Sequence, residues 1–218
     1  MAIDEDTVSR IESLRRLRSS LNDLEGSQVT LLGDVMLDRY HHGYANNLNS
    51  IAPVPVLKIF QTDESPGAAA HIARGLNSIG LGIDFHTFVG NDREGKAIVD
   101  MLIEDGITVT GIESVSDRHT LVKIRFFGSR ESLLEDSQIL LQADRGPLES
   151  IDSSMSEKLS NNAMKQLENS CALVISDYDN GAVTVSSASK LIGAAHKIGI
   201  PVIMDPKLTG LERSRGAT

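Results

Sequence analysis

The sequence predicts an α/β protein with a doubly wound, mainly parallel sheet and a small β-sheet lid. Two stretches, residues 29–112 and 153–204, alternate apolar strand patterns with helical ones, as in parallel sheets whose strands are joined by helices. Between them, residues 119–127 and 138–143 have strand patterns joined by a polar loop, which is typical of an antiparallel pair. The alternation predicts the main sheet, and the antiparallel pair predicts the lid.

The chain opens with a helix and a buried strand. Apolar residues recur every three or four positions over residues 5–24 and predict a helix that ends at Gly26. The apolar run 29–32, stopped by Gly33, predicts a buried strand. We therefore expect an N-terminal helix over residues 1–26, followed by an incomplete α/β domain over residues 27–218.

The following elements are predicted from the same periodicities. Segment 54–60 alternates but lies among prolines, which lack an N–H donor, so we expect it at a sheet edge or in the lid with 119–127 and 138–143. The Ala-rich stretch after Gly67 predicts a helix up to Gly80. The remaining predictions are strands at 83–89, 107–112, 171–176 and 201–204, and helices at 93–105, 153–168 and 184–198.

Composition excludes several classes of protein. The 218 residues include 21 Lys and Arg against 30 Asp and Glu, and a formal net charge of −9 disfavours binding to a nucleic-acid backbone. The single cysteine, Cys171, forms no internal disulfide, and no apolar run approaches the roughly 20 residues that span a bilayer. We therefore expect a cytoplasmic protein without a membrane or nucleic-acid partner.

Three polar clusters follow predicted strands: Gly33-Asp34, Ser176-Asp177-Tyr178 and Asp205-Pro206-Lys207. Because doubly wound sheets bind ligands beyond the carboxyl ends of their strands, one crevice is expected to collect all three. Asp34 and Asp38 add two carboxylates four residues apart, which suits the paired hydroxyls of a polyol. The alternative is that one acid caps a turn and the other pairs with Arg39.

Longer sequence motifs make the functional prediction more specific. GDVMLDRYHHG, APVPVLKI, ESPGAAAHIA, VGNDREG, ISDYDNGA, DPK and ERSRGAT follow one another between residues 29 and 218. In this order they resemble the PfkB, or ribokinase-like, carbohydrate kinases, in particular the heptose 7-phosphate kinases of ADP-heptose synthesis. The resemblance implies a ribokinase-like fold whose lid forms a homodimer. It also implies phosphorylation of C1 of a heptose 7-phosphate, a lipopolysaccharide core precursor, with ATP and Mg²⁺.

The resemblance also implies a substrate site. Asp38 takes the position of the acid that accepts the sugar hydroxyls, and Gly67 lies where the backbone approaches the sugar closely. Lys123 and Arg125 match basic residues of the lid that would meet the 7-phosphate, although a solvated strand face would look the same. The residues so implied are Asp38, Gly67, Ala68, His71, Lys123, Arg125, Asp177 and Lys207.

Several positions depart from the family pattern. His71 replaces an asparagine and either contacts a hydroxyl or is an ordinary helix histidine. In ISDYDNGA, Asn180 replaces a lysine, a possible phosphate contact, and Asp179 adds a charge that would repel an anion.

The family's motif for phosphate transfer, Asp-Thr-x-Gly-Ala-Gly-Asp, and its Asn-x-x-Glu motif for Mg²⁺ do not occur after Asp205, where the resemblance places them, and no G-x-x-x-x-G-K-[ST] loop replaces them. We therefore expect no catalytic base and no metal ligands in these residues. Two explanations stay open: a fragment of an active kinase, or a non-catalytic relative that binds a sugar phosphate or dimerises through its lid.

Overall fold

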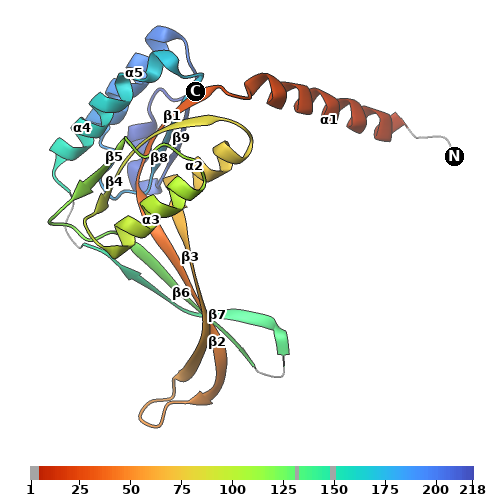
Figure 1. Cartoon of the computed structure of the whole chain (residues 1–218), viewed down its shortest axis with the longest axis vertical. Coiled ribbons are helices and arrows are strands. Elements are labelled where there is room, and N and C mark those ends of the chain that lie inside the picture. Colours follow the sequence, from red (N-terminus) through yellow and green to blue (C-terminus); the bar gives the residue numbers. More distant parts are fainter. Residues whose placement is uncertain (1–4, 131–132, 148–150) are drawn as a thin grey trace.

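A five-stranded parallel sheet, sheet A, forms the centre of the molecule, in the strand order β5-β4-β1-β8-β9 (Figure 1). The computed structural model describes residues 5–130, 133–147 and 151–218. The strands are β1 (Gln28–Gly33), β4 (Gly82–Gly90), β5 (Ile112–Val115), β8 (Ala172–Asp177) and β9 (Val202–Pro206). Since β4 and β8 flank β1, the strand order reverses beside β1, which confirms the doubly wound sheet.

Two apolar cores cover the faces of sheet A. Helices α2 (Ala69–Ser78) and α3 (Arg93–Glu104) pack on one face, where Leu31 and Phe85 are fully buried. Helices α4 (Ser153–Met164) and α5 (Val185–Ile198) pack on the other, against Leu32 and Ile175. Strands buried on both faces explain the continuous apolar runs in the sequence.

Four further strands form sheet B, which stands off the body as the predicted lid (Figure 1). Its order is β3-β2-β6-β7, with β2 (Val35–Leu48), β3 (Pro55–Ala68), β6 (Val122–Arg130) and β7 (Leu133–Arg145). The predicted strands 54–60, 119–127 and 138–143 lie in β3, β6 and β7. β3 is an edge strand, and β6 and β7 pair antiparallel, as expected.

The strand β2 is the lid element that the sequence did not reveal. It pairs antiparallel with β3 and parallel with β6, so it lies inside sheet B although its sequence is polar from Asp38 to Asn47. Much of the lid is exposed to solvent on both faces, so its strands need no alternation of apolar and polar residues.

Three predicted boundaries are wrong. The strand expected at 107–112 is β5, at Ile112–Val115, because Ile107 is buried in the core from a loop that has a single bridge to β4. The helix expected to 168 ends at Met164 and is followed by a 3-10 turn, η1 (Leu167–Asn169). The helix after Gly67 begins at Ala69, since β3 continues through Ala68.

The predicted N-terminal helix is present as α1 (Glu5–Leu24), and it projects away from the body (Figure 1). Its apolar residues stay exposed, including Leu14 at 65% and Leu17 at 57%. The chain closes with the 3-10 segment η2 (Leu208–Ser214), which packs against α5 and β9. Among the described residues, no helix is long and apolar enough to cross a membrane.

Candidate functional site

The carboxyl ends of β1, β8 and β9 meet at one edge of sheet A. Gly33 pairs with Ser176, Asp177 pairs with Pro206, and the Lys207 N–H donates to the Asp177 carbonyl at 3.1 Å. This edge also marks the reversal of strand order beside β1. The three strand ends therefore lie side by side at one edge, and a single crevice that collects all three polar clusters stays a prediction.

At this edge, the Asp34 side chain holds the loop that follows β8. Its carboxylate is buried and accepts three backbone N–H groups from the loop after β8, those of Tyr178 at 2.9 Å, Asn180 at 3.2 Å and Ala182 at 2.9 Å. Burial raises the pKa of Asp34, and the neighbouring Asp177 adds to this, although the three N–H groups act in the opposite direction. Asp34 is thus the acid of the pair that caps a turn.

Asp38 does not pair with Arg39. Its Oδ1 accepts from Nη1 of Arg125 at 2.8 Å, and Arg125 also contacts Tyr40, both through the hydroxyl at 3.2 Å and over the ring at 5.3 Å. Asp38 lies opposite Lys123, and Tyr40 opposite Arg125, across the β2–β6 ladder. Since alternate residues of a strand share a face, Asp38, Tyr40, Lys123 and Arg125 form one polar face of the lid.

Gly67 gives the Asp38 carboxylate its space. A Cβ atom built at Gly67 would collide with Oδ2 of Asp38 and crowd the Met36 side chain. The close neighbour of Gly67 in the structure is thus the Asp38 side chain, and the close approach of a sugar at this glycine stays a prediction. The next residue, Ala68, has φ 54° and ψ −127°, a conformation that suits glycine better than alanine.

A cavity of about 210 Å³ lies between the lid and the edge of sheet A. The lid contributes Lys123, and the body contributes Tyr178 and Lys207, whose Nζ sits 4.1 Å from the centre of the Tyr178 ring. Among the described residues, Lys123 and Lys207 form no ion pair with a carboxylate. The lining consists of Met36, Leu121, Val122, Lys123, Asp144, Arg145, Tyr178, Asn180 and Lys207.

The cavity is lined by cationic and neutral polar groups, Lys123, Lys207 and Tyr178, and by the carboxylate of Asp144, which lies opposite Lys123 in the β6–β7 ladder. Burial raises the pKa of the Tyr178 hydroxyl, and the nearby Asp205 and Asp38 raise it further, so this phenol stays neutral at physiological pH. Two lysines, a neutral phenol and the Asp38 carboxylate on the adjoining lid face offer partners for a molecule that carries both a phosphate and hydroxyls.

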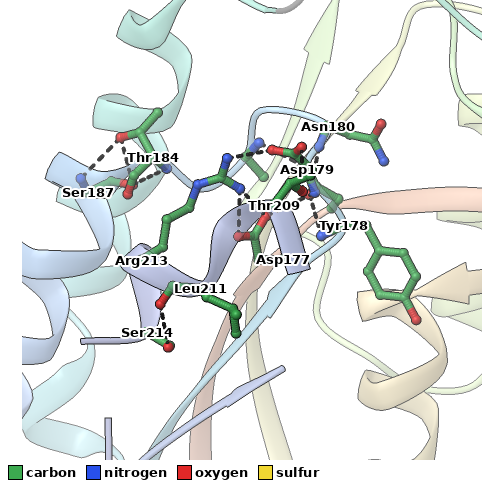
Figure 2. Close-up of polar contacts among 12 residues, drawn as sticks. Asp177, Tyr178, Asp179, Asn180, Thr184, Ser187, Thr209, Leu211, Arg213 and Ser214 are labelled. Atoms are coloured by element: carbon green, nitrogen blue, oxygen red, sulfur yellow. Dashed lines mark hydrogen bonds and ion pairs between the residues drawn. The ribbon is translucent and has the colours of Figure 1, made fainter. Parts of the chain in front are cut away.

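The structure does not bring all predicted site residues together. His71 is exposed on α2, in a separate surface hollow with Arg74 and Asp105. Asp177 is fully buried, and both of its carboxylate oxygens accept hydrogen bonds from Arg213 (Figure 2), so they are already engaged within the protein. Ala68 lies at the junction of β3 and α2, where it pairs with Val35. It does not line the cavity between lid and body.

A larger cavity of about 570 Å³ lies on the far side of the loop after β8. Its lining includes Arg118, Asp179, Thr184 and Arg213, and Asn180 is the residue that it shares with the smaller cavity. None of the residues that the sequence indicated as substrate-binding lines this larger space. The smaller cavity is therefore the candidate site.

Comparisons with known proteins agree with this architecture. No family model matches the chain. Over 202 residues, or 93% of its length, the chain is 34% identical to the bifunctional protein HldE of Cronobacter sakazakii and 33% identical to HldE of Escherichia coli. It spans 40% of the length of these relatives.

Among solved structures, the chain resembles phosphofructokinase-2 from Escherichia coli in complex with fructose-6-phosphate, with a TM-score of 0.63, 19% identity, and coverage of 87% of this chain and 57% of that one. It also resembles Arabidopsis thaliana ribokinase complexed with ribose and ATP, with a TM-score of 0.57, 16% identity, and coverage of 83% and 53%. The chain has the ribokinase-like fold and is a sequence relative of HldE. This confirms the predicted fold class and the resemblance on which it was based.

Sequence reasoning missed several residues of this candidate site. Tyr178 and Asn180 line the cavity from a loop, and Arg213 holds that loop from η2, 33 residues beyond Asn180. The strings ISDYDNGA and ERSRGAT contained these residues, but no spacing rule pairs an arginine with a loop so far away. The charge of Asp179, which the sequence predicts to repel an anion, is paired with Nη2 of Arg213 at 2.5 Å.

Proposed function

We propose that this chain is the acceptor-binding part of an ATP-dependent sugar kinase, and that the cavity between lid and body holds a heptose 7-phosphate. The observation that carries the proposal is the arrangement of Lys123 and Lys207 around one cavity, next to the Asp38 carboxylate. A phosphate requires cationic donors, and sugar hydroxyls require carboxylate acceptors. The heptose is taken from the motif resemblance, and the kinase activity from the ribokinase-like fold and the relationship to HldE.

In the proposed reaction, the anomeric hydroxyl of the sugar attacks the terminal phosphorus of ATP. An O–P bond to the sugar forms, the bond to the ADP oxygen breaks, and the hydroxyl proton passes to a base. Lys123 and Lys207 would hold the 7-phosphate at the far end of the sugar. Asp38, oriented by Arg125, would accept hydrogen bonds from ring hydroxyls and so fix which hydroxyl faces the nucleotide.

The described residues do not fit an ATP–Mg²⁺ site. No group of three or more His, Cys, Asp or Glu side chains among them is arranged to hold a metal ion, and the sequence has no phosphate-binding glycine loop followed by lysine. We therefore assign no step to a metal or a general base in this chain. A second candidate function, a catalytically silent module that binds a sugar phosphate, is favoured by Asn180, which stands where the motif resemblance implies a lysine.

The lid is the proposed dimer interface of a protein that acts in the cytoplasm. Its two edge strands carry large apolar residues in solvent, with Phe60 of β3 57% exposed and Leu141 of β7 58% exposed. Exposed apolar edges of this kind are the surfaces that a second subunit covers. Phe60→Glu is expected to shift the chain toward monomer in sedimentation velocity, whereas Ile103→Glu, at an equally exposed site on α3, is expected to leave the distribution unchanged.

Calorimetric titration with heptose 7-phosphate, the unphosphorylated heptose and inorganic phosphate tests the substrate site. The phosphorylated sugar is expected to bind, and Lys123→Ala or Lys207→Ala is expected to weaken binding about 10-fold, since each variant removes one charge-assisted contact. Lys190→Ala, which removes an exposed lysine of α5, is the control and should bind as the wild type does. Equal affinity for the sugar with and without phosphate would contradict the proposed site.

ADP release, measured with the same protein, separates the two candidate functions. Binding without ADP release favours the silent module. ADP release that depends on the sugar phosphate would establish kinase activity and would show that these residues hold a nucleotide site that our account does not contain.

A further inference from the structure

Arg213 joins η2 to the loop that follows β8. Its Nη1 donates to both oxygens of Asp177, at 2.9 and 2.7 Å, and its Nη2 donates to Oδ1 of Asp179 at 2.5 Å (Figure 2). The Arg213 side chain is 16% exposed, and the Asp177 side chain is completely buried. One guanidinium thus holds two carboxylates of a single turn, a geometry that lysine does not reproduce.

The same turn carries the body side of the candidate site. Tyr178 and Asn180, which alternate with the two aspartates, line the 210 Å³ cavity. Tyr178 supports the Nζ of Lys207 on its ring, and the Lys207 N–H is bonded to the Asp177 carbonyl. Together with the N–H groups that Asp34 accepts, the contacts of Arg213 therefore fix the backbone from which Lys207 extends and the ring on which its ammonium rests.

The turn requires such support. Asp179 has φ 61°, in the left-handed region that residues other than glycine rarely occupy. Its carboxylate is fixed further by the Thr209 hydroxyl at 2.9 Å, so η2 holds this residue at two points. At Gly210, a Cβ would lie 2.6 Å from Oδ2 of Asp177 and 2.9 Å from Nη1 of Arg213, so η2 fits tightly around the contact.

We propose that Arg213 is a positioning residue, which places Tyr178 and Lys207 for the phosphate of the substrate without touching the substrate itself. The inference rests on the proposed function, because it assigns the anion at Lys207 to a phosphorylated sugar. A free lysine side chain samples many rotamers, and ordering it during binding weakens affinity. A lysine whose backbone and ring support are fixed beforehand loses less entropy when the phosphate arrives.

The test compares Arg213→Ala, Arg213→Lys and Arg74→Ala in the full chain. Arg74 also forms an ion pair at 2.5 Å, with Asp105, but far from the cavity lining, so it is the matched control. Affinity for heptose 7-phosphate is measured by calorimetry, the midpoint of thermal unfolding by fluorescence, and amide hydrogen exchange over residues 178–182 by mass spectrometry.

We expect Arg213→Ala to weaken binding about 10-fold and to speed exchange over residues 178–182, and Arg213→Lys to recover only part of either loss. Arg74→Ala is expected to change neither quantity. Wild-type affinity in Arg213→Ala, with only a lower unfolding midpoint, would reduce Arg213 to a structural contact and overturn the inference. Absence of binding by the wild type would instead overturn the proposed function itself, and this inference with it.

Asp179→Asn provides a milder variant in case Arg213→Ala does not fold. Asparagine tolerates a positive φ and keeps the shape of the side chain, but it removes the charge opposite Nη2 of Arg213. Binding is expected to weaken by about 3-fold with an unchanged unfolding midpoint, since the hydrogen bonds from Arg213 to Asp177 remain. Unchanged affinity together with unchanged exchange over residues 178–182 would contradict the positioning role.

Discussion

The two walls of the candidate cavity are built in different ways. The lid wall consists of regular strands, in which the ladder between β2 and β6 alone sets Asp38 opposite Lys123. The body wall is a loop, and its shape depends on two side chains: Asp34 accepts its backbone N–H groups, and Arg213 donates to the carboxylates of Asp177 and Asp179. The backbone hydrogen bonds of a strand keep its register when a side chain is replaced. A loop that is held by a few carboxylates loses its conformation when one of them is removed.

The largest effect is expected at Asp34, because its buried carboxylate accepts three backbone N–H groups of the body wall. Asp34→Ala leaves three backbone N–H groups without their acceptor and is expected to lower the free energy of unfolding by about 3 kcal/mol or more. Urea denaturation measures it. Asp152→Ala, which removes a carboxylate bonded to the single N–H of Ser154, should cost only about 1 kcal/mol. Equal losses in both variants would show that Asp34 contributes no more than an ordinary helix-capping carboxylate.

The lid is joined to the body by Glu94, at the first turn of α3. This carboxylate accepts from Arg145 of β7 at 2.7 Å and from Arg39 of β2 at 3.1 Å. Burial by itself would raise the pKa of Glu94, but the hydrogen bonds from Arg145 and Arg39 outweigh it and lower the pKa below the ordinary value of 4.5. Glu94→Gln is expected to cost about 2 kcal/mol at pH 7.

The pH dependence follows from the sign of that shift. Because the folded-state pKa is lowered, the carboxylate contributes its stability fully above about pH 4.5 and loses it as the pH falls through the folded value. Urea denaturation at several pH values should therefore show the difference between the wild type and Glu94→Gln shrinking from pH 7 toward pH 3. A difference that stays constant over this range would contradict an ionic joint between lid and body.

Gly67 tests the lid wall. Gly67→Ala places a methyl group where the Asp38 carboxylate lies, and is expected to weaken the binding of heptose 7-phosphate about 10-fold by displacing that carboxylate. Gly193→Ala, on α5 with open space around its Cβ position, is the control and should bind normally in the same titration. Normal binding by Gly67→Ala would show that the position of Asp38 does not matter for the ligand.

The smallest effect is expected at the point where β3 passes into α2. Ala68 is held at a positive φ, and Ala68→Gly is expected to stabilise the protein by about 1 kcal/mol, because relief of strain exceeds the added chain entropy. Thermal unfolding measures the change. Ala73→Gly, in the middle of α2, should instead destabilise, and stabilisation by both variants would contradict the explanation from strain.

Regular elements of the fold were predictable from the sequence, whereas contacts between distant side chains were not. Apolar periodicity located sheet A and its helices, and the positions of strand ends predicted that the clusters at Asp34, Asp177 and Lys207 would meet. The strand β2 escaped because a solvated lid needs no apolar face. The strand predicted at 107–112 was misplaced because Ile107, a buried loop residue, gives the same apolar pattern as a strand. The partner of Asp177, Arg213, was not predictable, because side-chain contacts across a fold leave no period in the sequence.

The central claim is that one cavity binds the phosphate of a sugar phosphate between a lysine of the lid and a lysine of the body. A crystal structure of the chain with heptose 7-phosphate tests it most directly. The account predicts the phosphate within hydrogen-bond distance of both Lys123 and Lys207, with a sugar hydroxyl at Asp38. A phosphate bound elsewhere, for example in the larger cavity beside Arg118, would contradict it.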